Sequence, residues 1–396
     1  MPEGQFEFMR EVLGAPSPVG MEGAMTLGVL EPYIRDFLPD GWTLHHFRGN
    51  AGLVVDSGST GDGGLSVMII GHADKIRLQV RSIGKDGKIW VDSDSFLACT
   101  LIGHEVLLYS EDPNAPGEYR VLEGGTIEAL GAIHFSDPKL RAGTKGIKKE
   151  QLYLELQVHG EDRKRQIERL GIKAGDPILL NRKIRPGFSP DTFYGAYLDN
   201  GLGCFVVAEV ARLLADENLG HVRFLGAAAS HEEIGRFGSR VLAQEFRPDV
   251  VIGIDVSHDY EAAPNVTDKR LTPIEMGKGL TLSSGSITSA YLNTLYASVA
   301  REHGIPLQQK AAGRDTGTDA MAAVFASIDA AATSIGFPIR NMHTISETGH
   351  TRDVLAAIHA TVELIKHLDR ANVTTQDFRE GHPRLDQASE LTSDSE

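Results

Sequence analysis

The sequence predicts an α/β fold with a mixed central sheet between helix layers and an inserted small β-barrel-like domain. Two observations lead to this prediction. Apolar runs of strand length alternate with amphipathic helical segments over most of the chain, a pattern typical of a sheet covered by helices. Between residues 75 and 188 the pattern changes to short alternating segments split by Gly, Asp and Pro, which is typical of a small barrel or sandwich.

Residues 1–74 are expected to form the first part of the α/β domain. Apolar residues at helical spacing predict a helix over 22–38, and Pro32 within it predicts a kink or a late start. Three strands are then expected at 42–48, 51–56 and 65–71. The last strand is an almost continuous apolar run, so we expect it at the centre of the sheet, where both of its faces are covered.

Residues 75–188 are expected to form the inserted β-rich domain, to which we assign dimerisation below. Its strand-like segments are short and alternate apolar with polar residues, as at 89–91, 105–109 and 152–156. One helix is expected over 161–170, because Gly171 follows it and glycine commonly terminates helices.

Residues 189–372 are expected to complete the α/β domain. Helices are expected at 200–216, 236–246, 287–303, 318–327 and 351–369. Strands are expected at 222–229, 249–255, 306–311 and 330–336. The remaining residues, 373–396, are polar and acidic, and we expect this tail to be disordered.

The composition of the 396-residue chain excludes several classes of protein. With 39 basic and 54 acidic side chains the formal charge is −15, which argues against nucleic acid or an anionic membrane as a partner. No apolar run has the length of a membrane span, and the N-terminus lacks the pattern of a signal peptide. The two cysteines, Cys99 and Cys204, make neither a disulfide framework nor a Cys-type zinc site, so we expect a cytoplasmic location.

Residues 230–235, Ser-His-Glu-Glu-Ile-Gly, are the most informative segment. Glu232 and Glu233 follow an apolar strand, where two adjacent carboxylates are costly unless a cation lies between them. A metal site meets that need, because one Glu can bind the ion while the other acts as a general base on water. A solvated loop with acidic residues at a helix N-terminus is the alternative.

Matching side chains occur where other strands end or loops begin. His72 and Asp74 follow one strand, Asp255 ends another, and His343 lies in a later loop. Asp74 would orient the imidazole of His72. Asp199 precedes a helix, where it could cap that helix or bridge two cations. Together, two His, two Asp and one Glu suit two Zn²⁺ or Co²⁺ ions bridged by one carboxylate, and one Glu is left over as base.

Other catalytic motifs are not supported. The glycine-rich segment 313–319 precedes a helix but lacks the Gly-Lys-Ser/Thr ending of a phosphate-binding loop. Ser284–Ser286 does not supply the Gly-x-Ser-x-Gly turn that serine-based acyl transfer needs.

The ordered set of motifs resembles the tetrahedral aminopeptidases, a family of di-zinc metallopeptidases also called glutamyl aminopeptidases and formerly endoglucanases. The segments that carry the resemblance are Gly71–Asp74, Asp199–Cys204, Glu232–Gly235, Asp255–Ser257, Gly317–Ala320 and Arg340–Thr344. Weaker likeness extends from Pro18 to Asp353 and includes the insertion. The resemblance implies a zinc exopeptidase-like catalytic domain that removes N-terminal residues from short peptides.

The resemblance also implies a role for each site residue. Asp199 would bridge the two metals, His72 and Asp255 would complete one ion, and Glu233 and His343 would complete the other. The first residue of the acidic pair, at position 232, would be the base. The insertion would form dimers, and the dimers would assemble into a hollow dodecamer.

Three positions depart from the family pattern. The family usually has Glu where Lys75 stands, Arg where Gly201 stands and Tyr where Asn341 stands. None of them is an expected ligand. Lys75 directly follows the ligand segment, so it could enter the site, where it would favour acidic N-terminal residues, or it could be a solvated loop lysine. Two alternative functions therefore stay open: a related zinc-dependent deacylase or carboxypeptidase, and a non-catalytic metal-binding assembly protein.

Overall fold

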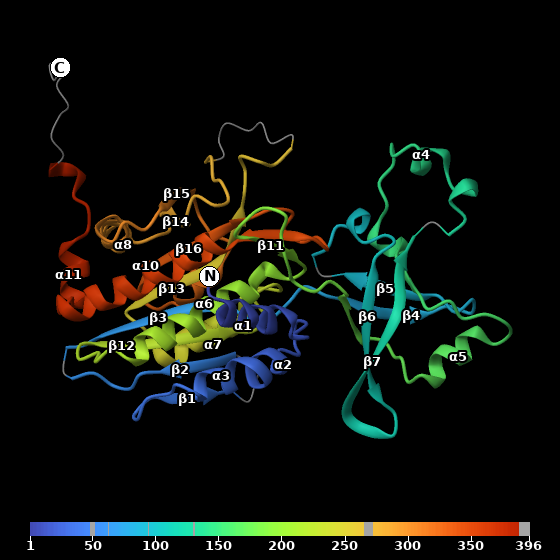
Figure 1. Ribbon diagram of the computed structural model, residues 1–396, viewed down its shortest axis with the longest axis horizontal. Coiled ribbons are helices and arrows are strands. Elements are labelled where there is room, and N and C mark those ends of the chain that lie inside the picture. Colours follow the sequence, from blue (N-terminus) through green and yellow to red (C-terminus); the bar gives the residue numbers. More distant parts are fainter. Residues whose placement is uncertain (48–51, 62, 94, 130, 265–271, 388–396) are drawn as a thin grey trace, which may run out of the picture.

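The computed structural model describes residues 1–47, 52–61, 63–93, 95–129, 131–264 and 272–387. Figure 1 shows a large α/β lobe beside a smaller β-rich lobe. None of the described helices is long and apolar enough to cross a membrane. The predicted strand ends at residues 48 and 51 and the last part of the tail, 388–396, lie outside the described residues.

The large lobe is built on an eight-stranded mixed sheet with the order β1-β2-β12-β3-β13-β16-β14-β15. Its strands are β1 (Thr43–His46), β2 (Gly52–Asp56), β12 (Val222–Ala229), β3 (Leu65–His72), β13 (Val250–His258), β16 (Ala331–Ile339), β14 (Leu280–Gly285) and β15 (Leu307–Ala312). The four central strands, from β12 to β16 in this order, run parallel, and an antiparallel strand lies on each side of them.

The central strand β3 has apolar side chains on both faces of the sheet. Val67 and Ile69 pack into the core on one face, whereas Met68 and Ile70 pack into the core on the opposite face. Because successive side chains of a strand point to opposite faces, a strand between two helix layers needs an unbroken apolar run. The placement of this strand at the centre is therefore confirmed.

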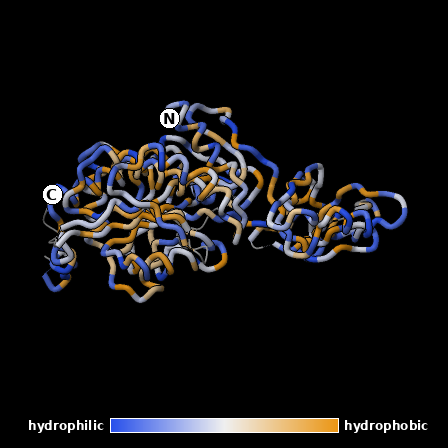
Figure 2. The backbone as a smooth tube through the Cα atoms, turned by 90° about the horizontal axis from the view of Figure 1, so that it is seen from below, coloured by the Kyte–Doolittle hydropathy of each residue, from blue (hydrophilic) through white to orange (hydrophobic). Residues whose placement is uncertain are grey.

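Helices cover both faces of the sheet, and Figure 2 shows apolar segments inside both lobes. One face is covered by α1 (Glu3–Gly14), α6 (Leu198–Ala215), α8 (Ala290–Glu302) and α10 (Thr351–Arg370). The other face is covered by α7 (Phe237–Phe246), a 3-10 turn at Asp319–Met321 and α9 (Ala322–Phe325). In α10, apolar residues at helical spacing face the core, as predicted.

The small lobe is a closed barrel with the strand order β4-β5-β8-β7-β6-β9. Its strands are β4 (Leu78–Ile83), β5 (Ile89–Ser93), β8 (Tyr153–Glu155), β7 (Ala115–Glu128), β6 (Glu105–Asp112) and β9 (Pro177–Leu180). Two short helices, α4 (Pro138–Arg141) and α5 (Arg163–Arg169), are attached to it, and Ile167 of α5 packs into the barrel core. The predicted fold class is confirmed, while the boundaries at residues 75 and 188 stay predictions.

A small antiparallel sheet joins segments that are far apart in the sequence. It consists of β10 (Arg185–Pro186), β11 (Thr192–Gly195) and β17 (Glu347–His350). The pairing of β11 with β17 places residue 347 beside the start of α6. This contact is important for the site described below.

Several elements differ from the sequence prediction, including the small sheet of β10, β11 and β17, which was not predicted. The helix expected over 22–38 is divided into α2 (Gly23–Met25), a π-helical turn (Thr26–Leu30) and α3 (Glu31–Arg35), because Pro32 has no N–H for a continuous helix. Helix α1 and strand β14 were not predicted. The expectation of a wholly disordered tail is wrong for α11 (Thr375–Glu380), where Phe378 packs edge-on against Tyr291.

Candidate metal centre

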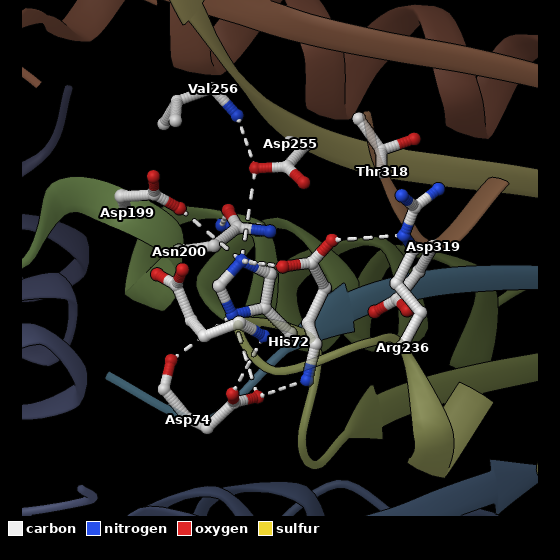
Figure 3. Close-up of polar contacts among 12 residues, drawn as sticks. His72, Asp74, Asp199, Asn200, Arg236, Asp255, Val256, Thr318 and Asp319 are labelled. Carbon is white, nitrogen blue, oxygen red and sulfur yellow. Dashed lines mark hydrogen bonds and ion pairs between the residues drawn. The ribbon is translucent and has the colours of Figure 1, made fainter. Parts of the chain in front are cut away.

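The predicted site residues lie together at one edge of the central sheet, where Figure 3 shows His72, Asp74, Asp199 and Asp255 close to one another. They come from the end of β3 (His72), from β13 (Asp255), from the loop after β12 (Glu232 and Glu233), from the loop after β16 (His343) and from the start of α6 (Asp199). Parallel strands place their carboxyl ends at the same edge, which explains the convergence. Because β13 continues to His258, Asp255 lies within the strand and not at its end.

The imidazole of His72 faces three carboxylates. Its Nε2 lies 3.2 Å from Asp199 Oδ1, 3.8 Å from Glu232 Oε2 and 4.0 Å from Asp255 Oδ1. Burial lowers the pKa of His72, but the hydrogen bond with Asp199 and the neighbouring carboxylates outweigh this and raise it. Acidic oxygens that converge on one ring nitrogen make a position that favours a cation.

A second imidazole approaches the same carboxylate from the other side. His343 Nε2 lies 3.2 Å from Asp199 Oδ2 and 3.8 Å from Glu233 Oε1. The two oxygens of Asp199 therefore face two different histidines. Glu233 Oε1 is buried and has no hydrogen-bond partner in the described part of the chain. A buried carboxylate oxygen without a partner is costly, and a bound cation would satisfy it.

Asp74 organises this site through the backbone. His72 Nδ1 lies 3.0 Å from the backbone oxygen of Asp74, and the Asp74 carboxylate is farther away, at 3.6 Å. That carboxylate instead accepts hydrogen bonds from the backbone N–H groups of Glu232 and Glu233, at 3.0 and 3.1 Å. Asp74 thus holds the turn that carries both acidic side chains, in addition to lying beside the imidazole (Figure 3).

Glu347 is a site residue that the sequence analysis missed. Its buried carboxylate accepts hydrogen bonds from the backbone N–H of Leu198 at 2.6 Å, of Asp199 at 3.4 Å and of His343 at 2.8 Å. Burial and the charge of Asp199 raise the pKa of Glu347 to about 8, although its hydrogen bonds oppose the shift. One side chain therefore positions two of the predicted ligands, which come from segments far apart in the sequence.

Asp319 is a second buried acid beside the site. The hydroxyl of Ser239 donates a hydrogen bond to its Oδ1 at 2.5 Å, while its Oδ2 is buried without a partner among the described residues. Burial raises the pKa of Asp319 to about 6, and His72 opposes the shift. The segment Gly317–Ala320 was recognised in the sequence, but no role was assigned to this carboxylate.

The acidic side chains of the site share one electrostatic environment. Burial raises the pKa of Glu232 to about 9 and that of Asp255 to about 8, and neighbouring carboxylates raise both values further, whereas His72 opposes the shift. Acids with pKa values above 7 are protonated at neutral pH unless a positive charge compensates them. The protein groups alone therefore leave the pocket short of positive charge.

Arg236 connects the acidic pair to a loop of the pocket. Its guanidinium forms a bidentate ion pair with Asp315 at 2.7 and 2.9 Å, and its Nε lies 3.7 Å from Glu232 Oε1. The same guanidinium lies 5.0 Å from the ring centroid of Phe325. Bidentate pairing and the aromatic ring fix the plane of the group, so Arg236 restricts the position of the Glu232 carboxylate.

Lys75 neither enters the site nor lies in solvent, so both interpretations of this residue are wrong. Its side chain is 1 % exposed, and its amine donates hydrogen bonds to the backbone oxygens of Leu13 and Ala15 at the C-terminal end of α1. A cation is favourable there because the last carbonyl groups of a helix carry partial negative charge. A Cβ at Gly201 would lie 2.7 Å from the Leu13 side chain. Lys75 and Gly201, two of the departures from the family pattern, are therefore explained by their contacts with α1.

The third departure, Asn341, directly precedes Met342 and His343, which line the pocket of the predicted ligands. Asn341 has a φ of 58°, a left-handed conformation that Asn adopts more readily than most residues. Beside it, a pocket of about 220 Å³ holds all the predicted metal ligands together with Glu232. Its remaining walls are formed by Val256, Ser257, His258, Lys310, Thr316, Gly317, Thr318 and Met342.

A mixed sheet between helices, with a carboxyl-edge cluster of histidines and acids and a spare Glu, defines the class of α/β metallopeptidases. Residues 52–360 match the sequence model of the M42 glutamyl aminopeptidase family, and the chain belongs to this family. It is accordingly a metal-dependent aminopeptidase, and the predicted peptidase activity is confirmed.

Similar proteins cover nearly the whole chain. The lysyl aminopeptidase of Pyrococcus furiosus is 28% identical over an alignment of 387 residues that covers 93% of this chain and 99% of that protein. A TET aminopeptidase from the marine sediment archaeon Thaumarchaeota archaeon SCGC AB-539-E09 has a TM-score of 0.81 at 23% identity and covers 95% of this chain and 99% of its own. The TET1 peptidase of Pyrococcus horikoshii, which can assemble into a tetrahedron or a large octahedral shell, has a TM-score of 0.71 at 21% identity and covers 91% and 99%.

Proposed function

We propose that this aminopeptidase removes N-terminal residues from short peptides with two divalent ions, Zn²⁺ or Co²⁺, in the pocket. The observation that carries the proposal is the convergence of His72, Asp199 and Glu233, whose ligand atoms all lie within 4.8 Å of one another. Imidazole nitrogen and carboxylate oxygen are donors that these ions accept. The unpartnered buried oxygen of Glu233 supports the same assignment.

The geometry of Asp199 supports a bridging position. Its Oδ1 faces His72 and its Oδ2 faces His343, each at 3.2 Å, so one carboxylate can serve two neighbouring ions. Asp255 would join His72 around one ion, and Glu233 would join His343 around the other. These assignments agree with the roles that the sequence resemblance implies.

Divalent ions at this place would polarise the scissile carbonyl and make a water molecule more acidic. Glu232 lines the pocket and is held by Arg236, so it would take the proton of the attacking water and pass it to the leaving amine. Asp74 would fix the turn that carries this base, and Glu347 would hold the segments of Asp199 and His343. These two acids act through other residues and would not touch the substrate.

The proposed reaction predicts hydrolysis only of substrates with a free N-terminus. We expect the metal-loaded enzyme to release p-nitroaniline from aminoacyl p-nitroanilides and to leave the N-acetylated compounds intact, as measured by absorbance. As a control, mass spectrometry of the products from N-acetylated and free peptides shows whether the N-terminal or the C-terminal residue is released. Hydrolysis restricted to N-blocked compounds would favour a deacylase, and release of the C-terminal residue would favour a carboxypeptidase. A metal-loaded protein with no hydrolytic activity would favour the non-catalytic alternative.

We also propose that the chain assembles into dimers and further into a dodecamer. Large apolar side chains are exposed on the barrel lobe: Leu97 at 66%, Tyr119 at 48%, Val121 at 49% and Phe135 at 91%. Burial of such side chains between copies would offset the repulsion caused by a net charge of −15 per chain. Closed symmetry then requires at least two interface patches on each subunit.

The proposed assembly predicts a particle mass of several chains. We expect multi-angle light scattering at moderate salt to give a mass close to twelve times 42.9 kDa. A Phe135→Asp variant should shift the mass towards smaller species, and an exposed polar position, Glu123→Asp, provides the matched control in the same lobe. A monomeric mass for the wild-type protein would contradict the proposed assembly.

The cysteines support the proposed cytoplasmic location. Cys99 is exposed and Cys204 is buried, and both are free thiols. Free thiols are typical of proteins from reducing compartments.

A further inference from the structure

Lys310 is a pocket residue that the proposed reaction does not use. It lies on β15, at the edge of the main sheet, where Gln308, Lys310 and Ala312 share the more buried face and the residues between them are exposed. This alternation turns Lys310 inward, and its side chain lines the same pocket as the metal ligands. Because β15 is the last strand of the sheet, its inward face forms a side wall of the pocket.

The ammonium group of Lys310 has no hydrogen-bond or ion-pair partner in the part of the chain that the structure describes. Within the described residues it makes no hydrogen bond and no ion pair within 4 Å, although burial lowers its pKa and the carboxylate of Asp255 raises it. Lys75 differs from Lys310 in this respect: its side chain is buried, and its amine donates hydrogen bonds to two backbone oxygens. A partly buried cation that the fold leaves unpaired has a missing partner, and in this pocket that partner can come from a bound ligand.

The charge balance of the pocket indicates the sign of that ligand. Four carboxylates line the pocket: Asp199, Glu232, Glu233 and Asp255. Two divalent ions would match the charge of these four carboxylates, and Lys310 would remain a pocket-lining cation without a hydrogen bond or ion pair among the described residues. His258 lies on the same wall, but burial and Lys310 both lower its pKa, so its imidazole adds no charge near neutral pH. Lys310 is therefore placed to bind a negative group of a ligand in this pocket.

We propose that Lys310 is a specificity-determining residue that binds a substrate carboxylate next to the scissile bond. This inference rests on the proposed function. Two carboxylates can reach such a position: the side chain of an N-terminal Glu or Asp, and the α-carboxylate of a dipeptide. An N-terminal Lys would place a like charge beside Lys310, so the preference should be opposite to that in the name of the Pyrococcus furiosus relative.

The test compares substrates that differ in one charge. We expect kcat/KM of the wild-type enzyme to be higher for Glu-p-nitroanilide than for the nearly isosteric Gln compound, and lowest for the Lys compound. Lys310→Met should lower kcat/KM for the Glu compound by about 10- to 100-fold, because a charge-assisted hydrogen bond is lost. For the Gln compound, kcat/KM should stay within about threefold of the wild-type value. Lys310→Glu should reverse the preference towards Lys, and Lys310→Arg should retain part of it.

A second arm distinguishes the source of the carboxylate. Leu-Gly and Leu-Gly-amide share the same N-terminal residue and differ only in the charge of the α-carboxylate. If Lys310→Met lowers kcat/KM only for Glu-p-nitroanilide, Lys310 binds the side-chain carboxylate of the N-terminal residue. If it lowers kcat/KM only for Leu-Gly, Lys310 binds the α-carboxylate of the dipeptide. Titration calorimetry with L-glutamate and L-glutamine gives a binding readout that is independent of turnover, and glutamate should bind tighter only when Lys310 is present.

The controls separate this inference from the proposed function. Lys278→Met, at an exposed lysine of the same lobe, should change none of these ratios, and elemental analysis should show equal metal content in all variants. If the wild-type protein hydrolyses none of the substrates, the proposed function is wrong. If the wild-type protein is active but Lys310→Met leaves both charge-dependent ratios and the glutamate affinity unchanged, the role of Lys310 is wrong and the proposed function stands.

Discussion

Replacement of Glu232 by Gln is expected to lower kcat by about 10²- to 10⁴-fold and to leave the metal content unchanged. Gln keeps the shape of the side chain but cannot accept the proton of the attacking water. A loss of that size corresponds to about 3–5 kcal/mol of transition-state stabilisation. KM should change little, because Glu232 is proposed to act on the reacting water and not to hold the substrate.

The measurement combines steady-state kinetics with elemental analysis of the purified variant. Glu245→Gln makes the same chemical change at an exposed position of α7 and should retain normal kcat. Near-normal turnover of Glu232→Gln would remove Glu232 from the role of base. A loss of turnover together with a loss of metal would instead identify Glu232 as a metal ligand.

Asp199→Ala is expected to abolish activity and to weaken the binding of both ions by more than about 100-fold, because removal of an outer partner of a ligand alone costs about 10- to 100-fold. The reason is geometric: the two oxygens of Asp199 face two histidines at 3.2 Å, so both proposed ion positions lose a ligand at once. Glu347→Gln should cause a smaller loss of activity and of metal affinity than Asp199→Ala. The reason is that Glu347 only holds the backbone of Leu198, Asp199 and His343.

Elemental analysis and calorimetric titration with Zn²⁺ or Co²⁺ provide the measurement. Asp216→Ala removes an exposed carboxylate after the same helix, α6, and should bind metal normally. Circular dichroism confirms that each variant is folded. If Asp199→Ala still binds two ions per chain, Asp199 is not the bridging residue, and if it loses one ion only, Asp199 belongs to a single position.

The candidate metal centre was largely predictable because its signal is local in the sequence. A carboxylate or histidine that directly follows an apolar strand is visible as a pattern, and parallel strands bring their carboxyl ends together. For the same reason the succession of central strands and helices along the chain was recognised, although their order within the sheet was not predicted. Short elements with weak patterns, such as β14 and the π-helical turn before Pro32, were missed or merged.

The lysines show where local patterns fail. Lys75 is adjacent in the sequence to the segment of His72, whereas Lys310 is more than 200 residues away from it. In the structure Lys75 points to the end of α1, and Lys310 lines the pocket. Side chains of consecutive residues at the end of a strand point in different directions. Proximity along the chain therefore does not indicate which side chain enters a site.

The sequence by itself determined the fold class, the metallopeptidase motifs and the residue types of the candidate ligands, because periodicity and residue chemistry are properties of short segments. Only the tertiary structure decided which oxygen of Asp199 faces which histidine, that Glu347 holds two distant segments, and that Lys310 lines the pocket. The physical reason is distance through space: electrostatic and hydrogen-bond energies depend on ångström separations between segments that only the packed sheet and helices bring together.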